Sequence, residues 1–244
     1  MTVLGFDTSM PTTAACVLRP GADPVATPSP APERLLGRPD HSAELLPLLA
    51  KLLGEAGIGW DDVEAIAVGV GPGTFTGLRI GVATARALAQ GLGIALHPVS
   101  SLEALAAGLA DVAGAGRPLL PLIDAKRREV FVAAYEARDP LVRLWGPEAL
   151  APEELVKRAR ELGERPLAAG DWSLESRSYL EKAGIEVPSG ESDLHAVSAV
   201  QICRLGMAAG PAPPEEVHPV YVRVPDAEIS RNARTEGPAG DVRA

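Results

Sequence analysis

Aromatic residues are scarce in this chain, at 4% of its 244 residues. Hydrophobic residues nevertheless make up 46% of the sequence, so we expect a packed core built mainly from Ala, Leu and Val. A chain of this length buries roughly 70% of its unfolded surface, either in one sizeable domain or in two smaller lobes.

Net positive charge is also missing, because the formal net charge is −9. That sign is unfavourable for a protein that binds nucleic acid on its own, so we expect any contact with RNA to come through a basic partner. The two cysteines, Cys16 and Cys203, lack metal-ligand spacing and cannot form a disulfide framework. We expect both to be buried small hydrophobic residues in a reducing compartment.

No apolar run is long enough to cross a membrane, and the first acidic residue, Asp7, comes too early for a secretory signal. These features predict a cytoplasmic protein without membrane contact. The histidines show no ligand spacing, so the sequence predicts no metal site. They are His41, His97, His195 and His218.

One segment, residues 65–89, organises the chain. Its apolar residues 65–70 predict a buried strand, and Gly-Pro-Gly at 71–73 predicts a turn. A helix should follow, with Thr74 or Thr76 as its N-cap residue.

Small residues at four-residue spacing lie on one face of that helix, at Gly77, Gly81, Ala85 and Ala89. Two interior glycines cost the helix about 1 kcal/mol each, which close approach of a second helix would offset. The alternative is that this face packs inside its own domain, and the spacing alone does not decide. A neighbouring row, flanked by Arg79 and Arg86, consists of Ile80, Thr84 and Leu88.

Other elements follow from hydrophobic periodicity and breakers. Strands are expected at 3–6, 13–18, 94–98, 119–123, 129–135 and 166–169. Helices are expected from Asp40 or Ser42 to about Gly57, with Pro47 inside, and at 101–109, 152–162, 173–183 and 194–209. The proline-rich residues 21–32 predict a loop or a poor edge strand, and residues 226–244 predict a disordered tail.

Two strand–Asp–strand units suggest where chemistry would lie, at Asp7 and at Asp124. The first turn contains Pro11 and no glycine, so its backbone is poorly suited to approach a phosphate. We predict a degenerate nucleotide or anion site formed by Asp7, Thr8, Ser9 and Asp124. The alternative is that each aspartate only caps a turn at its strand end.

Several motifs in a fixed order carry a family resemblance. They are 5–9 (GFDTS), 41–47 (HSAELLP), 71–81 (GPGTFTGLRIG), 99–105 (VSSLEAL), 123–127 (IDAKR) and 219–223 (PVYVR). Together they resemble the bacterial TsaB (YeaZ) family of tRNA threonylcarbamoyladenosine biosynthesis proteins. The resemblance implies a two-lobed α/β fold of the actin-like and sugar-kinase (ASKHA, RNase H-like) type with a degenerate second lobe. Residues 1–103 and 195–225 would form the first lobe and 104–194 the second.

The resemblance also implies a function. The chain would be a pseudoenzyme subunit, with no catalytic residue and no cofactor of its own, that stabilises and activates the catalytic paralogue TsaD. With TsaE and Mg-ATP, that complex transfers threonylcarbamoyl to the adenosine beside the anticodon in tRNAs that read codons beginning with adenine. This subunit would meet tRNA only through the complex. The positions matching the paralogue's two metal-binding histidines are Ser101 and Leu105 here.

The predicted docking surface on TsaD consists of Gly77, Ile80, Gly81, Thr84, Ala85 and Leu88. Gly81→Leu should then abolish pairing and leave the fold largely intact, and without TsaD the same face would form a homodimer. The alternative function is an independent actin-like ATPase or small-molecule kinase, with Asp7 and Asp124 around a Mg-nucleotide.

Overall fold

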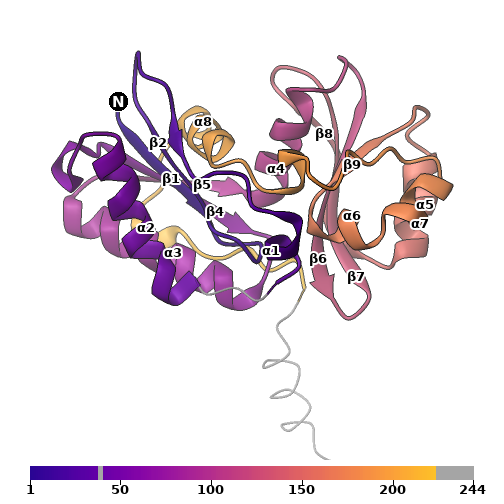
Figure 1. The fold of residues 1–244 in the computed structure, drawn as a ribbon, viewed down its shortest axis with the longest axis horizontal. Coiled ribbons are helices and arrows are strands. Elements are labelled where there is room, and N and C mark those ends of the chain that lie inside the picture. Colours follow the sequence, from indigo (N-terminus) through magenta and orange to yellow (C-terminus); the bar gives the residue numbers. More distant parts are fainter. Residues whose placement is uncertain (38–40, 224–244) are drawn as a thin grey trace, which may run out of the picture.

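The computed structural model describes residues 1–37 and 41–223. The tail predicted at 226–244 and the candidate cap Asp40 lie outside these residues. Two β-sheets stand side by side, each with helices on its outer face, and two further helices lie between them (Figure 1).

The first sheet has five strands in the order β3-β2-β1-β4-β5. Its strands are β1 (Val3–Asp7), β2 (Ala14–Leu18), β3 (Val25–Ala26), β4 (Ala65–Gly71) and β5 (Ala95–Ser100). β1 pairs antiparallel with β2 and parallel with β4, and β4 pairs parallel with β5. The proline-rich segment therefore contributes only a two-residue edge strand, β3, as its composition predicts.

The second sheet has four strands in the order β8-β7-β6-β9. Its strands are β6 (Pro118–Lys126), β7 (Glu129–Glu136), β8 (Val142–Leu150) and β9 (Leu167–Ala169). The pairing repeats the first sheet, since β6 is antiparallel to β7 and parallel to β9. Within the described residues this repeat stops one strand short of the first sheet, so the second lobe is the reduced copy that the resemblance implies.

Helices separate three apolar clusters. The helices are α1 (Pro32–Leu35), α2 (His41–Glu55), α3 (Phe75–Leu92), α4 (Ser101–Ala110), α5 (Pro152–Arg160), α6 (Asp171–Glu175), α7 (Arg177–Lys182) and α8 (Ala199–Ala209). One cluster lies beneath α2 and α3 on the first sheet, and another beneath α5 and α7 on the second. The third joins both sheets through α4 and α8, so the lobes share a continuous core. The predicted lobe boundary at 103/104 falls inside α4.

Most predicted elements are present, but α1 was not predicted, and three further differences appear. β8 was not predicted, because its first residues are exposed and Gly146 and Pro147 interrupt its pattern. The helix expected at 173–183 is two short helices that meet at Ser176. The last helix begins at Ala199 with Ser198 as its cap, and a 3-10 turn precedes it at Asp193–His195.

Both cysteines are buried, as predicted, and the Cys203 thiol lies 3.7 Å from the carbonyl oxygen of Cys16. Among the described helices, none combines the length and apolar character that a membrane span needs.

Candidate functional site

The first strand–Asp turn is closed. Asp7 is 1% exposed, and both of its carboxylate oxygens already accept hydrogen bonds from the chain itself. Oδ1 accepts from the Ser9 amide at 2.8 Å and from the Ser9 hydroxyl at 2.5 Å. Oδ2 accepts from the Ser101 hydroxyl at 2.5 Å. Burial raises the pKa of Asp7, and the bonds from Ser101 and Ser9 oppose that rise.

Ser101 connects this turn to the next strand. Its hydroxyl donates to Asp7 and accepts from the Gly71 amide at 3.2 Å, so β1, β4 and the start of α4 meet at one atom. The resemblance aligns Ser101 with a metal-binding histidine of the catalytic paralogue. Leu105, aligned with the second histidine, is 1% exposed in the core between the lobes. In the described part of the chain, no group of three or more His, Cys, Asp or Glu side chains has the geometry to hold a metal ion.

The glycine-rich loop after β4 closes over the same turn. A Cβ on Gly69 would lie 1.7 Å from Asp7 Oδ2, and one on Gly73 would lie 2.4 Å from Ser9 Cβ. The Ser9 carbonyl also accepts from the Thr74 amide at 2.8 Å. These glycines are therefore required for close packing on the β1 turn. Thr74 is the N-cap residue of α3, and Thr76 lies inside the helix.

The small-residue face of α3 is turned into its own lobe. A Cβ on Gly77 would lie 2.0 Å from the Thr8 carbonyl oxygen, and one on Gly81 would lie 2.2 Å from Thr8 Oγ1. Thr8 Oγ1 donates to the Gly77 carbonyl at 2.7 Å. Ala85 and Ala89 continue this buried face. The predicted docking ridge of Gly77, Gly81 and Ala85 is thus wrong, because the chain's own β1 turn occupies the space left by the missing side chains. The expectation that Gly81→Leu leaves the fold intact fails for the same reason, because the new side chain would meet Thr8.

The other half of the predicted docking set remains accessible. Ile80, Thr84 and Leu88 are half-buried, and the apolar pair among them also contacts the core under α3. Spacing could not separate the two halves, because it fixes which residues share a face but not what that face meets.

The second strand–Asp turn is open. Asp124 accepts from the Lys126 amide at 2.7 Å and pairs with the Lys126 ammonium at 2.5 Å. Its own amide donates to Asp171 Oδ1 at 2.9 Å. Asp171 is 4% exposed, and burial raises its pKa to about 7. The predicted site thus divides into two separate turns: each aspartate bonds the amide two positions along the chain, and Asp7 is bonded in addition by Ser101.

Helix α1 lies between the two turns. Leu35 is 2% exposed and belongs to the core that joins the lobes. Leu35 and Leu36 line a small cavity together with Pro11 from the first turn, Asp124 from the second turn and Asp171 from the start of α6. Figure 1 places α1 in the space between the sheets. The proline-rich segment thus leads into α1, whose buried Leu35 fills space between the two turns, and we call this contact the α1 plug.

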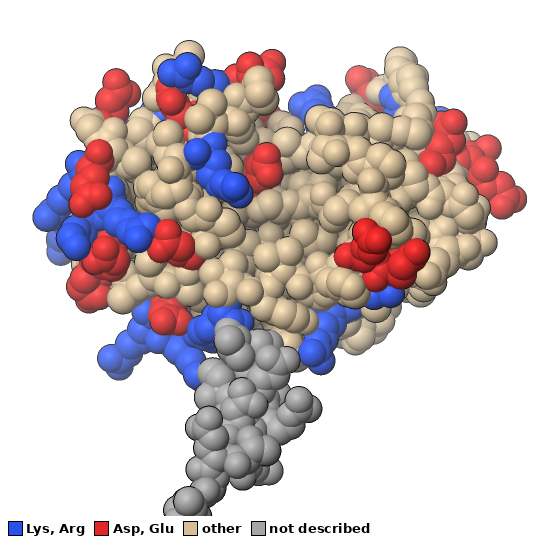
Figure 2. Space-filling view, turned by 180° about the vertical axis from the view of Figure 1, so that it is seen from behind, with Lys and Arg blue, Asp and Glu red and all other residues tan. Residues whose placement is uncertain are grey.

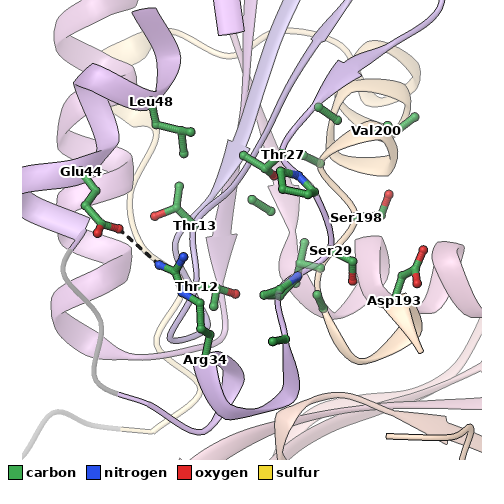
Figure 3. A pocket seen from close by; sticks show the side chains of 18 of the residues that line it. Thr12, Thr13, Thr27, Ser29, Arg34, Glu44, Leu48, Asp193, Ser198 and Val200 are labelled. Carbon is green, nitrogen blue, oxygen red and sulfur yellow. Dashed lines mark ion pairs between the residues drawn. The ribbon is translucent and has the colours of Figure 1, made fainter. Parts of the chain in front are cut away.

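A larger pocket, of about 780 Å³, lies between α2, residues 27–31 and the start of α8. Figure 3 shows the Arg34–Glu44 ion pair, 3.7 Å long, on the side opposite Ser198 and Asp193. Hydroxyl groups of Thr12, Thr13, Thr27 and Ser29 contribute to the lining. With one arginine already paired and two carboxylates, the lining favours a neutral polar molecule over a phosphate.

Sequence reasoning missed both this pocket and Asp171. The signal for Asp171 was present, because Gly170-Asp171 follows a strand parallel to β6 and the carboxyl ends of parallel strands share one edge. The pocket had no such signal, since irregular backbone at 27–31 forms one of its walls.

Comparison with known proteins agrees with this architecture. Residues 36–199 match the family model "TsaD: tRNA N6-adenosine threonylcarbamoyltransferase". The tRNA threonylcarbamoyladenosine biosynthesis protein TsaB of Bacillus subtilis is 30% identical over 235 residues, covering 93% of this chain and 96% of that protein. TsaB of Escherichia coli is 31% identical over 194 residues, covering 75% and 81%. The structure of YeaZ from Pseudomonas aeruginosa superposes with a TM-score of 0.71 at 26% identity, covering 90% of this chain and 99% of that one.

These matches cover most of the chain, and the superposition on YeaZ covers both of its sheets. The fold is the two-lobed actin-like and sugar-kinase fold, and the chain belongs to the TsaB (YeaZ) family.

Proposed function

We propose that this chain is a non-catalytic subunit of the machinery that makes threonylcarbamoyladenosine in tRNA. It would stabilise and activate a TsaD-type threonylcarbamoyltransferase, its catalytic paralogue. The names of the Bacillus subtilis and Escherichia coli relatives support the pathway. The match of residues 36–199 to the TsaD family supports a common fold for the two subunits.

The hydrogen bonds that occupy the Asp7 carboxylate are the observation on which the proposal mainly rests. In a catalytic member of this fold, the carboxylate at the end of the first strand must face a metal–phosphate group. Here its oxygens are occupied by Ser9 and Ser101, and Gly69 leaves no room beside it. Breaking those bonds to admit a phosphate would leave buried donors unpaired, and each unpaired group would cost about 1–3 kcal/mol of stability. The chain is therefore better suited to present a surface than to perform phosphate chemistry.

The outer face of α3 is our candidate for that surface. Ala83 and Ala87 are exposed beside the half-buried row of Ile80, Thr84 and Leu88. Helices α2 and α3 form the outer layer of the first lobe, on the side away from the second sheet (Figure 1). A partner helix can approach this layer without disturbing the core between the lobes. In the absence of the partner, the same row would join two copies of this chain.

The complex, rather than this chain, would use ATP and Mg²⁺, with TsaE as a further component, and tRNA would be modified on the TsaD-type subunit. No residue of this chain is assigned a catalytic role. The independent ATPase alternative loses support from two features, the occupied oxygens of Asp7 and the α1 plug.

Association with the TsaD-type protein of the same organism tests the proposal. Equimolar full chains would be mixed and analysed by size-exclusion chromatography with light scattering. We expect a heterodimer, and we expect Thr84→Arg with Leu88→Arg to weaken it at least tenfold. Leu144→Arg is the control, because Leu144 is 42% exposed on β8, away from α3.

Melting curves would verify that both variants fold. A wild-type chain that does not associate would contradict the subunit role. A heterodimer that tolerates both α3 substitutions would leave the subunit role in place and reject the α3 surface.

A further inference from the structure

Arginines lie along one edge of this acidic chain. Arg79 Nε donates to the Tyr221 hydroxyl at 3.1 Å. Arg223, two residues after Tyr221, forms an ion pair with Glu129 at 2.6 Å. Glu129 is the first residue of β7 and follows directly on Arg127 and Arg128 in the β6–β7 turn. We call Arg79, Arg127, Arg128 and Arg223 the basic edge. It runs from the start of α3 to the tip of the second sheet.

The charge of this edge opposes that of the chain. The formal net charge is −9, yet Lys and Arg side chains gather along the lower edge of the molecule in Figure 2. Acidic side chains also lie at this edge, since Asp124 pairs with Lys126 and Glu129 pairs with Arg223, so they balance part of its positive charge. Guanidinium groups suit phosphates because they offer paired donors in a planar fork.

The β6–β7 turn has an unexpected sequence for its backbone. Arg127 and Arg128 have φ values of 54° and 63°, in the left-handed region. Two-residue turns of this kind favour Asn-Gly, because side chains with a Cβ are sterically disfavoured there. The chain places two arginines at these positions instead. Unfavourable backbone at an exposed site points to a function for the side chains.

Aromatic rings complete the edge. Phe75 and Tyr221 are 37% and 38% exposed, and their ring centroids are 5.2 Å apart. The Arg79 guanidinium carbon lies 3.8 Å from the centroid of the Phe75 ring. The chain has only three phenylalanines and three tyrosines, and two of these six rings are exposed beside one arginine. Rings and guanidinium planes of this kind stack on unpaired bases.

We infer that the basic edge, with Phe75 and Tyr221, binds the phosphate backbone and an unpaired base of an RNA loop. The inference rests on the proposed function, because a tRNA is then the RNA brought to the complex. It revises the expectation from the sequence that this subunit contacts tRNA only through its partner. That expectation used the negative net charge of the whole chain, which does not describe a local surface of positive charge.

The test is tRNA binding by the full chain, alone and with the TsaD-type protein, using an unmodified tRNA transcript and fluorescence anisotropy from 50 to 200 mM salt. The double variant Arg127→Asn with Arg128→Gly removes two charges and supplies the residues that the turn favours. We expect affinity to fall about tenfold at low salt and the salt slope to fall by about 1.5, near the value for two lost phosphate contacts.

The same variant should melt a few degrees higher, because its turn is less strained, so a loss of binding cannot be attributed to unfolding. The control is Lys157→Gln with Arg160→Gln on α5, which removes the same charge elsewhere and should leave affinity within about twofold. Tyr221→Ala should weaken binding at least fivefold with little change in the salt slope, as loss of a stacked base predicts.

Unchanged tRNA affinity in both edge variants would overturn the inference and leave the subunit role intact. So would edge variants that lose the TsaD-type protein but bind tRNA normally, which would make the edge a protein-binding surface. If the wild-type proteins fail to associate, the proposed function fails, and the measurement on the chain alone still decides the RNA inference. Equal losses in the α5 control would also overturn it.

Discussion

The two strand–Asp turns of this chain look alike in sequence and differ in the structure. After β1, Asp7 is enclosed by Ser9, Ser101 and a glycine-rich loop. After β6, Asp124 bonds a lysine of an exposed, arginine-bearing hairpin. The repeat preserves the backbone plan, because both aspartates bond the amide two residues along. It does not preserve the environment. One turn has become part of the core and the other part of the surface, so a shared fold does not give the two aspartates a shared function.

Alanine substitution of the two aspartates should expose this difference most strongly. Asp7→Ala leaves the Ser9 and Ser101 donors buried without an acceptor, and we expect a loss of about 3 kcal/mol in the free energy of unfolding. Asp124→Ala breaks only bonds within an exposed turn and should cost about 1 kcal/mol. Urea denaturation measures both. Equal costs would show that the turns are not as different as we describe.

Glycine substitutions in α3 test the closed turn from its other side. Gly77→Ala would drive a Cβ to 2.0 Å from the Thr8 carbonyl oxygen, and we expect a loss of about 3 kcal/mol. Gly81→Ala meets a side-chain hydroxyl and should cost less. A Cβ added at Gly91 of the same helix would point into open space among the described residues, so Gly91→Ala should stabilise by about 0.5–1 kcal/mol. A harmless Gly77→Ala would contradict the closed packing.

The open turn has a titratable neighbour, Asp171, whose pKa is raised to about 7 by burial. A raised pKa means that the folded chain holds this proton more tightly than the unfolded chain. Its stabilising contribution is therefore present at acidic pH and is lost as the pH rises through 7. Asp171→Asn keeps an oxygen for the Asp124 and Trp172 amides and cannot ionise.

Between pH 5 and pH 7, the free energy of unfolding of this variant should rise by about 2 kcal/mol relative to that of wild type. The reason is that one pKa unit corresponds to about 1.4 kcal/mol. Urea denaturation at a series of pH values measures the difference. Parallel pH curves for wild type and Asp171→Asn would contradict the raised pKa.

A small change is also expected at the hairpin tip. Arg127→Asn with Arg128→Gly should stabilise the fold by about 1 kcal/mol, because both positions have left-handed backbone. Thermal melting measures it, with Lys157→Gln and Arg160→Gln as the charge-matched control. Destabilisation by the turn variant alone would mean that the arginines hold the hairpin rather than serve binding.

Sequence reasoning identified the elements with strong periodicity, such as β4, α3 and the two hairpins, because burial on one face leaves a regular pattern. It missed β8, whose first residues are exposed. It also identified the residues of the β1 turn but not their state. The bonds from Ser101 to Asp7 and from Thr8 to Gly77 join positions 94 and 69 residues apart. Only tertiary structure reveals whether a small-residue face meets a partner or its own lobe.

Calorimetric titration of the isolated full chain with Mg-ATP tests the central claim. That claim is that Asp7 stabilises the β1 turn and that the chain binds a partner protein instead of catalysing a reaction. We predict no saturable heat of binding that depends on Asp7, and no release of phosphate. Tight binding of Mg-ATP that Asp7→Asn abolishes while the chain stays folded would contradict the account.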